Sequence, residues 1–348
     1  MNHPLVTVII INWNRGRDTI ECLESIYQID YPKFQVVLLD NSSSDDSLQQ
    51  IRDYCQGKIT VSSPYFNYQS TNKPLKFGEY SKGQFTTGDG VSDVSHDLLL
   101  LKNDRNQGFA EGNNLAIEFS IQNLKPDYIL LLNNDTVVEE EFLTELVKAA
   151  QNSDQIGFAG PKIYYYDYQG RKDVINFAGG YLNLNTGHSQ SIGVGEVDTG
   201  QYDTLRRVDY VEGSCLLVKT PVLEEIGLLD PSFFAYWEET DLCTRGHQAG
   251  YDSVMVPQAR IWHKISSSTP TPDRLYYYTR NKFFFMKKHA SPGQYRNFLF
   301  YFFGFLFWKM NLTLLIDGIV DHETPHHKYF IKGVRHGLKG PQDQGGPG

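Results

Sequence analysis

A short apolar segment that ends on polar side chains is the most informative chemical feature of this 348-residue chain. Residues 128–132 are aromatic or aliphatic, and Asn133, Asn134 and Asp135 follow directly. Such a run is typical of an interior strand of a parallel sheet. Ligands of open α/β sheets bind at the carboxyl ends of strands, where a carboxylate beside two amides can hold a divalent cation. The same residues also suit a turn and helix cap, so both interpretations stay open.

An acidic cluster is the second candidate. Glu238, Glu239 and Asp241 lie within four residues, directly after the aromatic run 233–237. Carboxylates this close together are costly unless they are solvated, paired or used in chemistry. They could favour the dipole of a helix that continues to residue 249. Alternatively, one of them could be a general base that takes a proton from an acceptor hydroxyl.

A predicted strand at 257–263 ends on His263. A single histidine is more often structural than a ligand. Here, however, only a short helix and this strand separate it from the acidic cluster, which could return it to the same site. Imidazole is an acceptable ligand for a manganese-type site.

Amide and carboxylate side chains also follow strands in the first third of the chain. Asn12 follows the apolar run 6–11, Asp40 follows 34–39, and the loop 106–114 comes after 98–101. Asp40 could accept a hydrogen bond from a pyrimidine N–H, and a glycine such as Gly108 lets the backbone approach a ligand closely. Neither the P-loop sequence nor Gly-x-Gly-x-x-Gly occurs in the loop, so these two phosphate-binding motifs are excluded.

The elements that must position these residues alternate between strand and helix, which indicates βαβ units and a mostly parallel central sheet flanked by helices. Residues 57–97 lack sustained periodicity and predict an irregular insertion. Short β-like pieces follow at 156–211. The expected strands are 6–11, 34–39, 98–101 and 128–132, and the expected helices are 18–27, 46–54, 114–123, 139–152 and 220–226.

Composition limits the classes of function. A net charge of −9 gives no global basic field for nucleic acid, so we expect no nucleic-acid partner. The four cysteines form no Cys-x-x-Cys pair, which fits a reducing cytosol. The first apolar run is too short for a signal peptide and lacks a basic leader. We therefore expect a cytoplasmic protein.

The C-terminal region has a different character. Residues 298–308 are intensely aromatic, but Lys309, Asn311 and Asp317 interrupt the apolar run before the roughly 20 residues that a spanning helix needs. Residues 295–320 are therefore expected to form either a buried or homodimer-forming helix, or a helix lying on the inner face of a membrane. The tail 340–348 is rich in Gly, Pro and Gln and is predicted to be disordered. The nearby cations are Lys287, Lys288, Arg296 and Lys309.

In this order, the features resemble the family 2 glycosyltransferases with a GT-A fold, and among them the bacterial rhamnosyltransferase-like and galactofuranosyltransferase-like members. The resemblance covers about residues 5–290. It implies a GT-A domain at 1–290, with a Rossmann-like nucleotide-binding half (1–135) and an acceptor half (136–290), then a helical extension at 291–339. The matching stretches are 8–14, 37–42, 106–114, 131–135, 212–218, 227–230, 234–245, 249–251, 263 and 278–281.

The resemblance implies a donor site at the first strand ends. Asn12 and Asp40 would hold the base of a nucleotide-diphosphate sugar, and Asn106 with Gly108 would line the nucleotide pocket. Four further amides lie in the matching stretches and are assigned to the same pocket. These are Asn14, Asn114, Asn133 and Asn134.

The resemblance also implies a metal site and a base. Asp135 matches the last position of the family's Asp-x-Asp motif and would bind Mg²⁺ or Mn²⁺, while Asn133 replaces the first acid. His263 matches a metal ligand of some relatives. Glu239 matches the catalytic base, which is usually Asp, and Glu238 and Asp241 remain rivals for this role.

We therefore expect an inverting, metal-assisted transfer of a sugar from dTDP-rhamnose or a UDP-sugar to a hydroxyl of a polysaccharide or lipid-linked glycan. Two alternatives stay open. A nucleotidyltransferase would place nucleotide and metal at the same strand ends, but the loops here carry amides rather than the cations a triphosphate needs. A catalytically degenerate scaffold or binding protein would keep the fold, and the two changes from the family pattern leave room for it.

Overall fold

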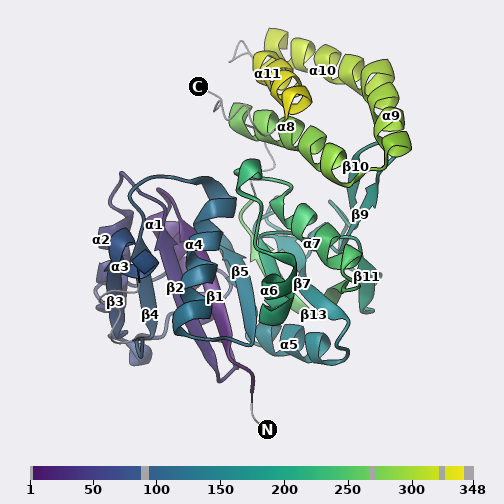
Figure 1. The fold of residues 1–348 in the computed structure, drawn as a ribbon. Helices are drawn as coiled ribbons and strands as arrows, with labels where there is room; N and C mark the ends of the chain where they lie inside the picture. Colours follow the sequence, from purple (N-terminus) through teal and green to yellow (C-terminus); the bar gives the residue numbers. More distant parts are fainter. Residues whose placement is uncertain (1–2, 88–93, 266–270, 321–325, 341–348) are drawn as a thin grey trace.

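The computed structural model describes residues 3–87, 94–265, 271–320 and 326–340, with the side chains of 315–320 excepted. One central mixed sheet forms the core of the larger part of the molecule, and a group of C-terminal helices lies beyond one of its ends (Figure 1). Within the described residues this sheet has eleven strands, nine of them in the order β11-β13-β7-β12-β5-β1-β2-β4-β3.

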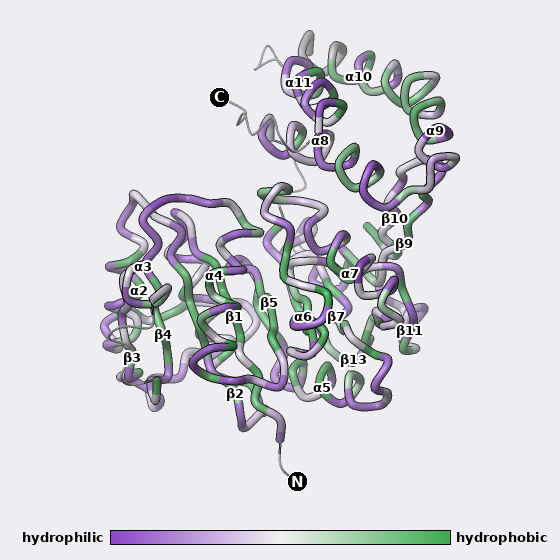
Figure 2. Tube along the Cα trace, in the orientation of Figure 1, coloured by the Kyte–Doolittle hydropathy of each residue, from purple (hydrophilic) through white to green (hydrophobic). Residues whose placement is uncertain are grey.

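The N-terminal half of the sheet is parallel. Its four interior strands, β1, β2, β4 and β5, are apolar runs that are largely buried, as the sequence predicts, and Figure 2 shows their hydrophobic character. The register pairs Asn12 with Asp40 and places Asn133 opposite Ile11, so the polar strand ends lie along one edge. The strands are β1 (Val6–Asn12), β2 (Phe34–Asp40), β3 (Phe77–Ser81), β4 (Leu98–Lys102) and β5 (Tyr128–Asn133).

The other half of the sheet is mixed. β12 runs antiparallel between β5 and β7, while β13 pairs with β7 in parallel. β13 also pairs with the short β6, which sets His263 opposite Thr136, next to Asp135. The strands are β6 (Thr136–Val138), β7 (Ile156–Tyr165), β8 (Ile175–Phe177), β11 (Arg206–Val208), β12 (Cys215–Lys219) and β13 (Asp252–His263), with a separate hairpin of β9 (Gly180–Asn183) and β10 (His188–Ser191).

Amphipathic helices cover the sheet. α4 packs against β1 and β2, and α5 packs against β7 and β13, so each helix buries its apolar side on the sheet. The helices of this part are α1 (Gly16–Ile26), α2 (Ser47–Cys55), η1 (Ser70–Asn72), α3 (Lys82–Thr87), α4 (Gly108–Asn123), α5 (Phe142–Gln151), α6 (Thr220–Ile226), η2 (Pro231–Phe233) and α7 (Glu238–Gln248).

The C-terminal helices form a second apolar core. Phe283, Phe298, Phe302 and Phe330 are buried in it, together with Trp237 from the catalytic part. The aromatic segment 298–308 therefore lies only partly in this core, because other aromatic side chains of the segment are exposed. No helix among the described residues has the length and apolarity needed to cross a membrane. The helices are α8 (Pro272–His289), α9 (Pro292–Tyr301), the π-helical η3 (Phe302–Leu306), α10 (Phe307–Val320) and α11 (His326–Lys339).

Three details differ from the sequence prediction. The stretch 57–97, expected to be irregular, contains β3 and α3, which periodicity missed because β3 is a half-exposed edge strand of five residues. α4 begins at Gly108 rather than at residue 114, so most of the predicted loop is helix. β6 was not predicted either. The tail predicted to be disordered lies outside the described residues, apart from Gly340.

Candidate active site

Asp135 and His263 meet at the carboxyl end of β5. The backbone N–H of Lys264 donates to the carbonyl of Asp135 at 2.9 Å, which ties the end of β13 to the turn after β5. Nε2 of His263 lies 3.0 Å from Oδ1 of Asp135, and Nδ1 lies 3.6 Å from Oε1 of Glu212. Oδ1 of Asp135 and Nδ1 of His263 are both buried and have no hydrogen-bond partner among the described residues.

The electrostatics of this pair follow from the carboxylates around the imidazole. Burial alone would lower the pKa of His263, but the charge of Asp135, with help from Glu212, raises it to about 10. Burial works in the opposite direction on Asp135, yet the histidine lowers the pKa of that carboxyl. The site therefore favours positive charge between these two side chains.

Asn12 and Asp40, predicted to hold the base of a nucleotide, bind each other. Nδ2 of Asn12 donates to Oδ1 of Asp40 at 2.7 Å, and Asp40 also accepts from the backbone N–H and the hydroxyl of Ser43. Asp40 is 2% exposed, so direct contact between this carboxylate and a base is not favoured. Asn134 joins the same network, because its Nδ2 donates to Thr19 at 2.9 Å and lies 3.5 Å from Oδ1 of Asn12.

Gly108 has a role other than the predicted one. Its φ is +82°, and a Cβ at this position would lie 2.5 Å from the ring of Phe234 and 2.6 Å from its carbonyl oxygen. The close approach that requires glycine is thus made to Phe234 and not to a ligand. Oδ1 of Asn106 accepts from the N–H of Gly108 at 2.9 Å and from Asn41 at 3.0 Å.

The remaining predicted amides serve different ends. Asn114 lies inside α4 and exchanges two hydrogen bonds with the backbone of Leu229, which assigns it a structural role. This was not foreseen because the sequence placed it in a loop. Asn14 has a φ of 55° and accepts from the N–H of Ser44 at 2.8 Å. Asn133 ends β5, and its backbone N–H donates to Ser214.

Glu238 and Glu239 begin α7. Glu239 is half-buried, accepts from the hydroxyl of Thr240 at 3.1 Å, and its side chain lies against Gly213, next to Glu212. Burial raises the pKa of Glu239 to about 7. Glu238 is 4% exposed and its Oε2 has no hydrogen-bond partner. Burial and the neighbouring charge of Glu239 raise the pKa of Glu238 well above its usual range, which makes Glu238 the weaker candidate for a base.

The segment that leads into α7 is strained. Phe234, Tyr236 and Trp237 have φ values of 64°, 68° and 77°, a region that side chains other than glycine rarely adopt. Each such residue costs about 1–3 kcal/mol and persists only where its surroundings impose it. The carbonyl of Phe234 accepts from the N–H groups of Phe109 and Ala110 at the start of α4, at 2.7 and 3.1 Å.

Two neighbouring residues of α8 hold this strained segment in place. Nδ2 of Asn281 donates to the carbonyls of Phe233, Ala235 and Tyr236 at 2.7–2.8 Å. The guanidinium of Arg280 donates to Phe233 and, one residue earlier, to Ser232, both at 2.9 Å. Helix α8 thus fixes the backbone that delivers Glu238 and Glu239 to the site.

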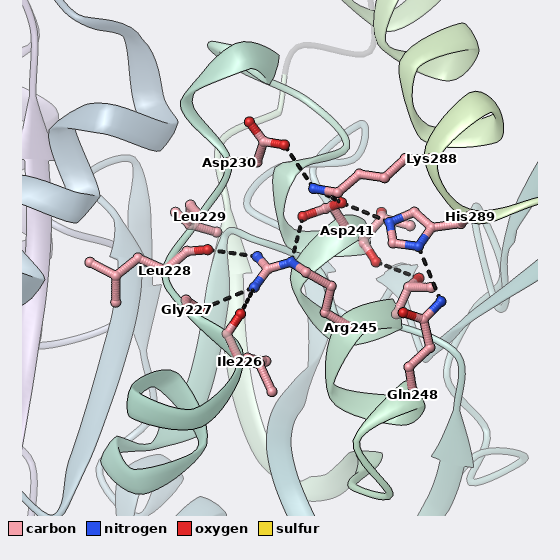
Figure 3. Close-up of polar contacts among 12 residues, drawn as sticks. Ile226, Gly227, Leu228, Leu229, Asp230, Asp241, Arg245, Gln248, Lys288 and His289 are labelled. Atoms are coloured by element: carbon pink, nitrogen blue, oxygen red, sulfur yellow. Dashed lines mark hydrogen bonds and ion pairs between the residues drawn. The ribbon is translucent and has the colours of Figure 1, made fainter.

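Asp241 is not a free carboxylate (Figure 3). It is fully buried and forms ion pairs with Arg245 at 2.9 Å, Lys288 at 2.8 Å and His289 at 2.7 Å. Burial would raise the pKa of Asp241, but the hydrogen bond from His289 and the two cations lower it to about 2. Its place among the candidate bases is therefore corrected: Asp241 anchors α7 to α8. The sequence could not show this, because Lys288 and His289 lie 47 and 48 residues away in the chain.

One functional candidate was missed. Glu212 faces His263. The only signal for Glu212 in the amino-acid sequence was its position in a stretch that matches the family. The structure thus brings Asp135, His263, Glu212 and Glu239 to one edge of the sheet. An acid with a pKa near neutrality beside a buried pair that attracts positive charge suits proton transfer next to a bound cation.

A parallel half, a mixed half and a carboxylate at the end of the strand between them are typical of a GT-A glycosyltransferase fold. Comparison with known proteins agrees. The model of "Glycosyltransferase like family 2" matches residues 94–283, more than half of the chain, and that of "Glycosyl transferase family 2" matches residues 7–68. The chain belongs to glycosyltransferase family 2.

Curated relatives are similar over part of their length. The low-salt glycan biosynthesis hexosyltransferase Agl10 of Haloferax volcanii is 28% identical over 172 residues, covering 48% of this chain and 51% of that protein. The dTDP-rhamnosyl transferase RfbF of Shigella flexneri is 23% identical over 222 residues, 61% of this chain and 70% of that protein. The chain thus spans about half the length of the Haloferax relative.

Solved structures show the same fold. The mannosyltransferase PcManGT of Pyrobaculum calidifontis, in complex with GDP-Man and Mn²⁺, has a TM-score of 0.54 at 12% identity and covers 97% of this chain and 87% of its own. TarS 1–349 of S. aureus, in complex with UDP-GlcNAc, has a TM-score of 0.54 at 13% identity, with 96% and 80% covered. The predicted GT-A fold with C-terminal helices is confirmed.

Proposed function

We propose that this protein transfers a sugar from a nucleotide-diphosphate donor to a hydroxyl of a glycan acceptor, with inversion at the anomeric carbon. The observation that carries the proposal is the position of Glu239. Its carboxyl has a pKa raised to about 7 by burial, and it lies next to Glu212 at the strand ends where Asp135 and His263 meet. A carboxylate poised near neutrality is suited to take a proton from an attacking hydroxyl.

Mg²⁺ or Mn²⁺ would be held by Asp135 and His263. Their facing atoms are 3.0 Å apart, the separation expected of adjacent ligands with metal bonds of about 2.1 Å, and Oδ1 of Asp135 has no partner other than His263 among the described residues. No group of three or more His, Cys, Asp or Glu suited to a metal occurs among the described residues, so substrate phosphates and water would complete the shell. When bound, the ion would neutralise charge on the leaving diphosphate.

The protein's own residues then have separate tasks. Glu239 takes the hydroxyl proton as the acceptor oxygen attacks the anomeric carbon from the face opposite the leaving group, as inverting glycosidases also arrange their base. Arg280 and Asn281 keep the segment before Glu239 in its strained conformation. The network around Asn12 and Asp40 shapes the donor side.

The substrates proposed are dTDP-rhamnose or a UDP-sugar as donor and a polysaccharide or lipid-linked glycan as acceptor. Support comes from relatives. RfbF is named as a dTDP-rhamnosyl transferase. A 64-residue stretch is 41% identical to the N-acetylglucosaminyl-diphospho-decaprenol L-rhamnosyltransferase of Mycobacterium tuberculosis, covering 18% of this chain and 21% of that protein.

Thermal stability against a panel of nucleoside diphosphates and nucleotide sugars, with and without Mn²⁺, tests the donor site. A ligand of the native state raises Tm by mass action. We expect a metal-dependent shift for one nucleotide sugar, together with slow hydrolysis of that donor. Binding without hydrolysis or transfer would favour the degenerate scaffold, and no shift for any compound would contradict the proposal.

We further propose that residues 295–320 contact the inner face of a membrane. Phe300, Phe305, Trp308 and Leu312 are 72%, 54%, 65% and 62% exposed, a larger apolar surface than scattered exposed residues would give. Figure 2 shows this apolar character along α9 and α10. Residues 273–339 carry eleven Lys and Arg against four Asp and Glu, a net charge of +7, whereas residues 1–272 carry 21 against 36, a net charge of −15. Basic charge beside exposed aromatic rings favours an anionic lipid surface.

Flotation with vesicles of phosphatidylcholine alone, or with added phosphatidylglycerol, tests this contact. We expect the wild-type protein to float with the anionic vesicles, Phe305→Ser/Trp308→Ser to stay behind, and Leu338→Ser, which removes an apolar residue that is 43% exposed on α11, to float normally. A protein that floats with neither vesicle and is a dimer by light scattering would show that the same surface is a homodimer interface.

A further inference from the structure

Lys282 is a half-buried cation in the middle of α8 whose surroundings are aromatic. Its Nζ lies 5.5 Å from the ring centroid of Tyr278 and 6.0 Å from that of Trp237. It forms no ion pair or hydrogen bond with any described residue. Burial lowers the pKa of Lys282 to about 8. Keeping a cation in such surroundings costs free energy, because no carboxylate compensates for the lost water.

The other cations of α8 show how unusual this is. Arg280, two residues earlier, donates to backbone carbonyls. Lys288 pairs with Asp230 and Asp241 at 2.7 and 2.8 Å. Their charges are used within the fold. The charge of Lys282 has only the two cation–π contacts and no anionic partner among the described residues, so an anionic ligand is the natural partner.

The surroundings of Lys282 belong to the acceptor side of the site. Trp237 directly precedes Glu238 and Glu239 in the chain. Burial raises the pKa of Tyr278, and the charge of Glu239 adds to this shift, which places the Tyr278 ring near the proposed base. The hydroxyl of Tyr278 is also hydrogen-bonded to Ser189 of β10 at 2.8 Å, which fixes the ring.

The donor diphosphate is a poor candidate for this ligand. It would lie at the strand ends, with Asp135 and His263. Lys282 is not among the main charges that act on either of these residues. An anion at Lys282 would therefore belong to the acceptor and not to the donor.

We infer that Lys282, with the rings of Trp237 and Tyr278, forms a subsite for a phosphate or diphosphate on the acceptor, next to the sugar that receives the transferred residue. This inference rests on the proposed function and names the class of its acceptor. The two rings offer apolar faces for packing against a sugar or its linker, while the ammonium group pairs with the phosphate as a compact point charge. Arg274, two turns earlier on α8 and 5.9 Å from the ring of Tyr236, lies on the same side of the helix and extends the positive wall.

The test is the dissociation constant of octyl diphosphate, measured by calorimetry with saturating UDP or dTDP and Mn²⁺ so that the donor site is occupied. The variants are Lys282→Met, Lys282→Arg and, as a matched control, Lys287→Met at an exposed position of the same helix. Loss of a hydrogen bond to a charged group predicts a dissociation constant roughly tenfold or more higher for Lys282→Met. Lys282→Arg should recover most of the binding, and Lys287→Met should match the wild type.

The melting temperature is a second readout, and it distinguishes a ligand-binding lysine from a purely structural one. Because Lys282 is an uncompensated cation, Lys282→Met is expected to keep or raise Tm while it loses the diphosphate. Lys282→Gln replaces it if that variant fails to fold. Wild-type protein that does not bind octyl diphosphate, or binds it as tightly as Lys282→Met does, overturns the inference.

Two further binding measurements distinguish the kind of acceptor and separate failure of the subsite from failure of the donor site. Glucose 1-phosphate in place of octyl diphosphate distinguishes a phosphorylated glycan from a lipid diphosphate, because binding of the sugar phosphate alone would point to a water-soluble acceptor. UDP and dTDP binding, measured first, tests the proposed function itself. If neither nucleotide nor any nucleotide sugar binds, the donor site fails; if they bind and Lys282 has no effect, only the subsite fails.

Discussion

The proposed donor side and the proposed acceptor side of this site differ in how their polar groups are paired. On the donor side, Asn12 donates to Asp40 and Ser43, and the hydroxyl of Ser43 donates to Asp40, at the ends of β1 and β2. In the segment that leads into α7, Trp237 Nε1 and Glu238 Oε2 are buried and have no hydrogen-bond partner among the described residues. The network around Asn12 and Asp40 is satisfied internally, whereas this segment keeps polar groups unpaired.

Backbone conformation differs in degree, since Asn14 and Ser42 on the donor side also have positive φ, at 55° and 66°. The acceptor side has three non-glycine residues with positive φ within four positions, at 234, 236 and 237. At about 1–3 kcal/mol each, such residues and the unpaired groups beside them need external support. Arg280, Asn281 and the ion pairs of Asp241 supply it from α8. The contrast indicates that the donor side and α8 stabilise the fold. The acceptor side, in comparison, holds its reactive groups in a conformation that costs free energy.

The largest expected effect separates the two carboxylates that begin α7. General-base assistance is typically worth about 10²–10⁴-fold, so Glu239→Gln should lower kcat by at least that factor while the Tm shift caused by the donor is unchanged. Steady-state rates with the identified donor and acceptor measure this. Glu238→Gln is the matched control. Because Glu238 is the weaker candidate for the base, this variant should lower kcat far less than Glu239→Gln does. Equal losses in both variants would remove the distinction between them.

The next effect concerns stability and tests the support from α8. Removing one partner of a buried ion pair typically costs about 3–5 kcal/mol, so Asp241→Asn should lower the free energy of unfolding by that amount in urea titrations. Asp230→Asn is the control. Asp230 is a half-exposed partner of Lys288, and exposed pairs are worth about 0–1 kcal/mol.

The pH dependence of this stability has a defined sign. The folded pKa of Asp241 is about 2, below the value of about 3.9 expected for an unfolded chain. Its contribution should therefore be complete above pH ~4 and be lost as the pH falls toward 2. A urea midpoint difference between wild type and Asp241→Asn that stays constant down to pH 2 would contradict this account.

The pH profile of catalysis sharpens the contrast again. Because burial raises the pKa of Glu239 to about 7 and a base acts in its deprotonated form, kcat/KM should fall about tenfold per unit below pH 7 and level off above it. Donor binding measured over the same range serves as the control, since it does not require this proton transfer. A flat profile between pH 5.5 and 8 would show that Glu239 is not the base.

The sequence was sufficient for the frame of the site because that frame rests on buried apolar strands. Runs such as 6–11 and 128–132 identify interior strands, and parallel pairing then brings their polar ends to one edge, as the register of Asn12 with Asp40 shows. The same reasoning could not reach contacts between distant segments. Gly108 makes room for Phe234, and Asn281 holds Tyr236; neither pairing leaves a local pattern.

Backbone strain was equally invisible, since Phe234, Tyr236 and Trp237 are not residues that favour positive φ. β3 was missed for a simpler reason: a half-exposed edge strand shows no apolar run. Sequence periodicity thus recovers elements that are stabilised by burial, and it fails where tertiary hydrogen bonds impose a conformation.

The smallest expected effect falls on the donor side and shows what a closed network contributes. In the wild-type protein the backbone N–H of Ser43 donates to Oδ2 of Asp40 at 3.0 Å. Asp40→Asn keeps the size of the side chain but turns an amide N–H toward this backbone donor. Leaving that buried donor unpaired should cost about 1–3 kcal/mol of unfolding free energy, less than Asp241→Asn. The slope of kcat/KM with pH should not change, because Glu239 is untouched. If Asp40→Asn instead abolished turnover at full stability, Asp40 would contact the donor directly, and the division between a supporting donor side and a reactive acceptor side would have to be redrawn.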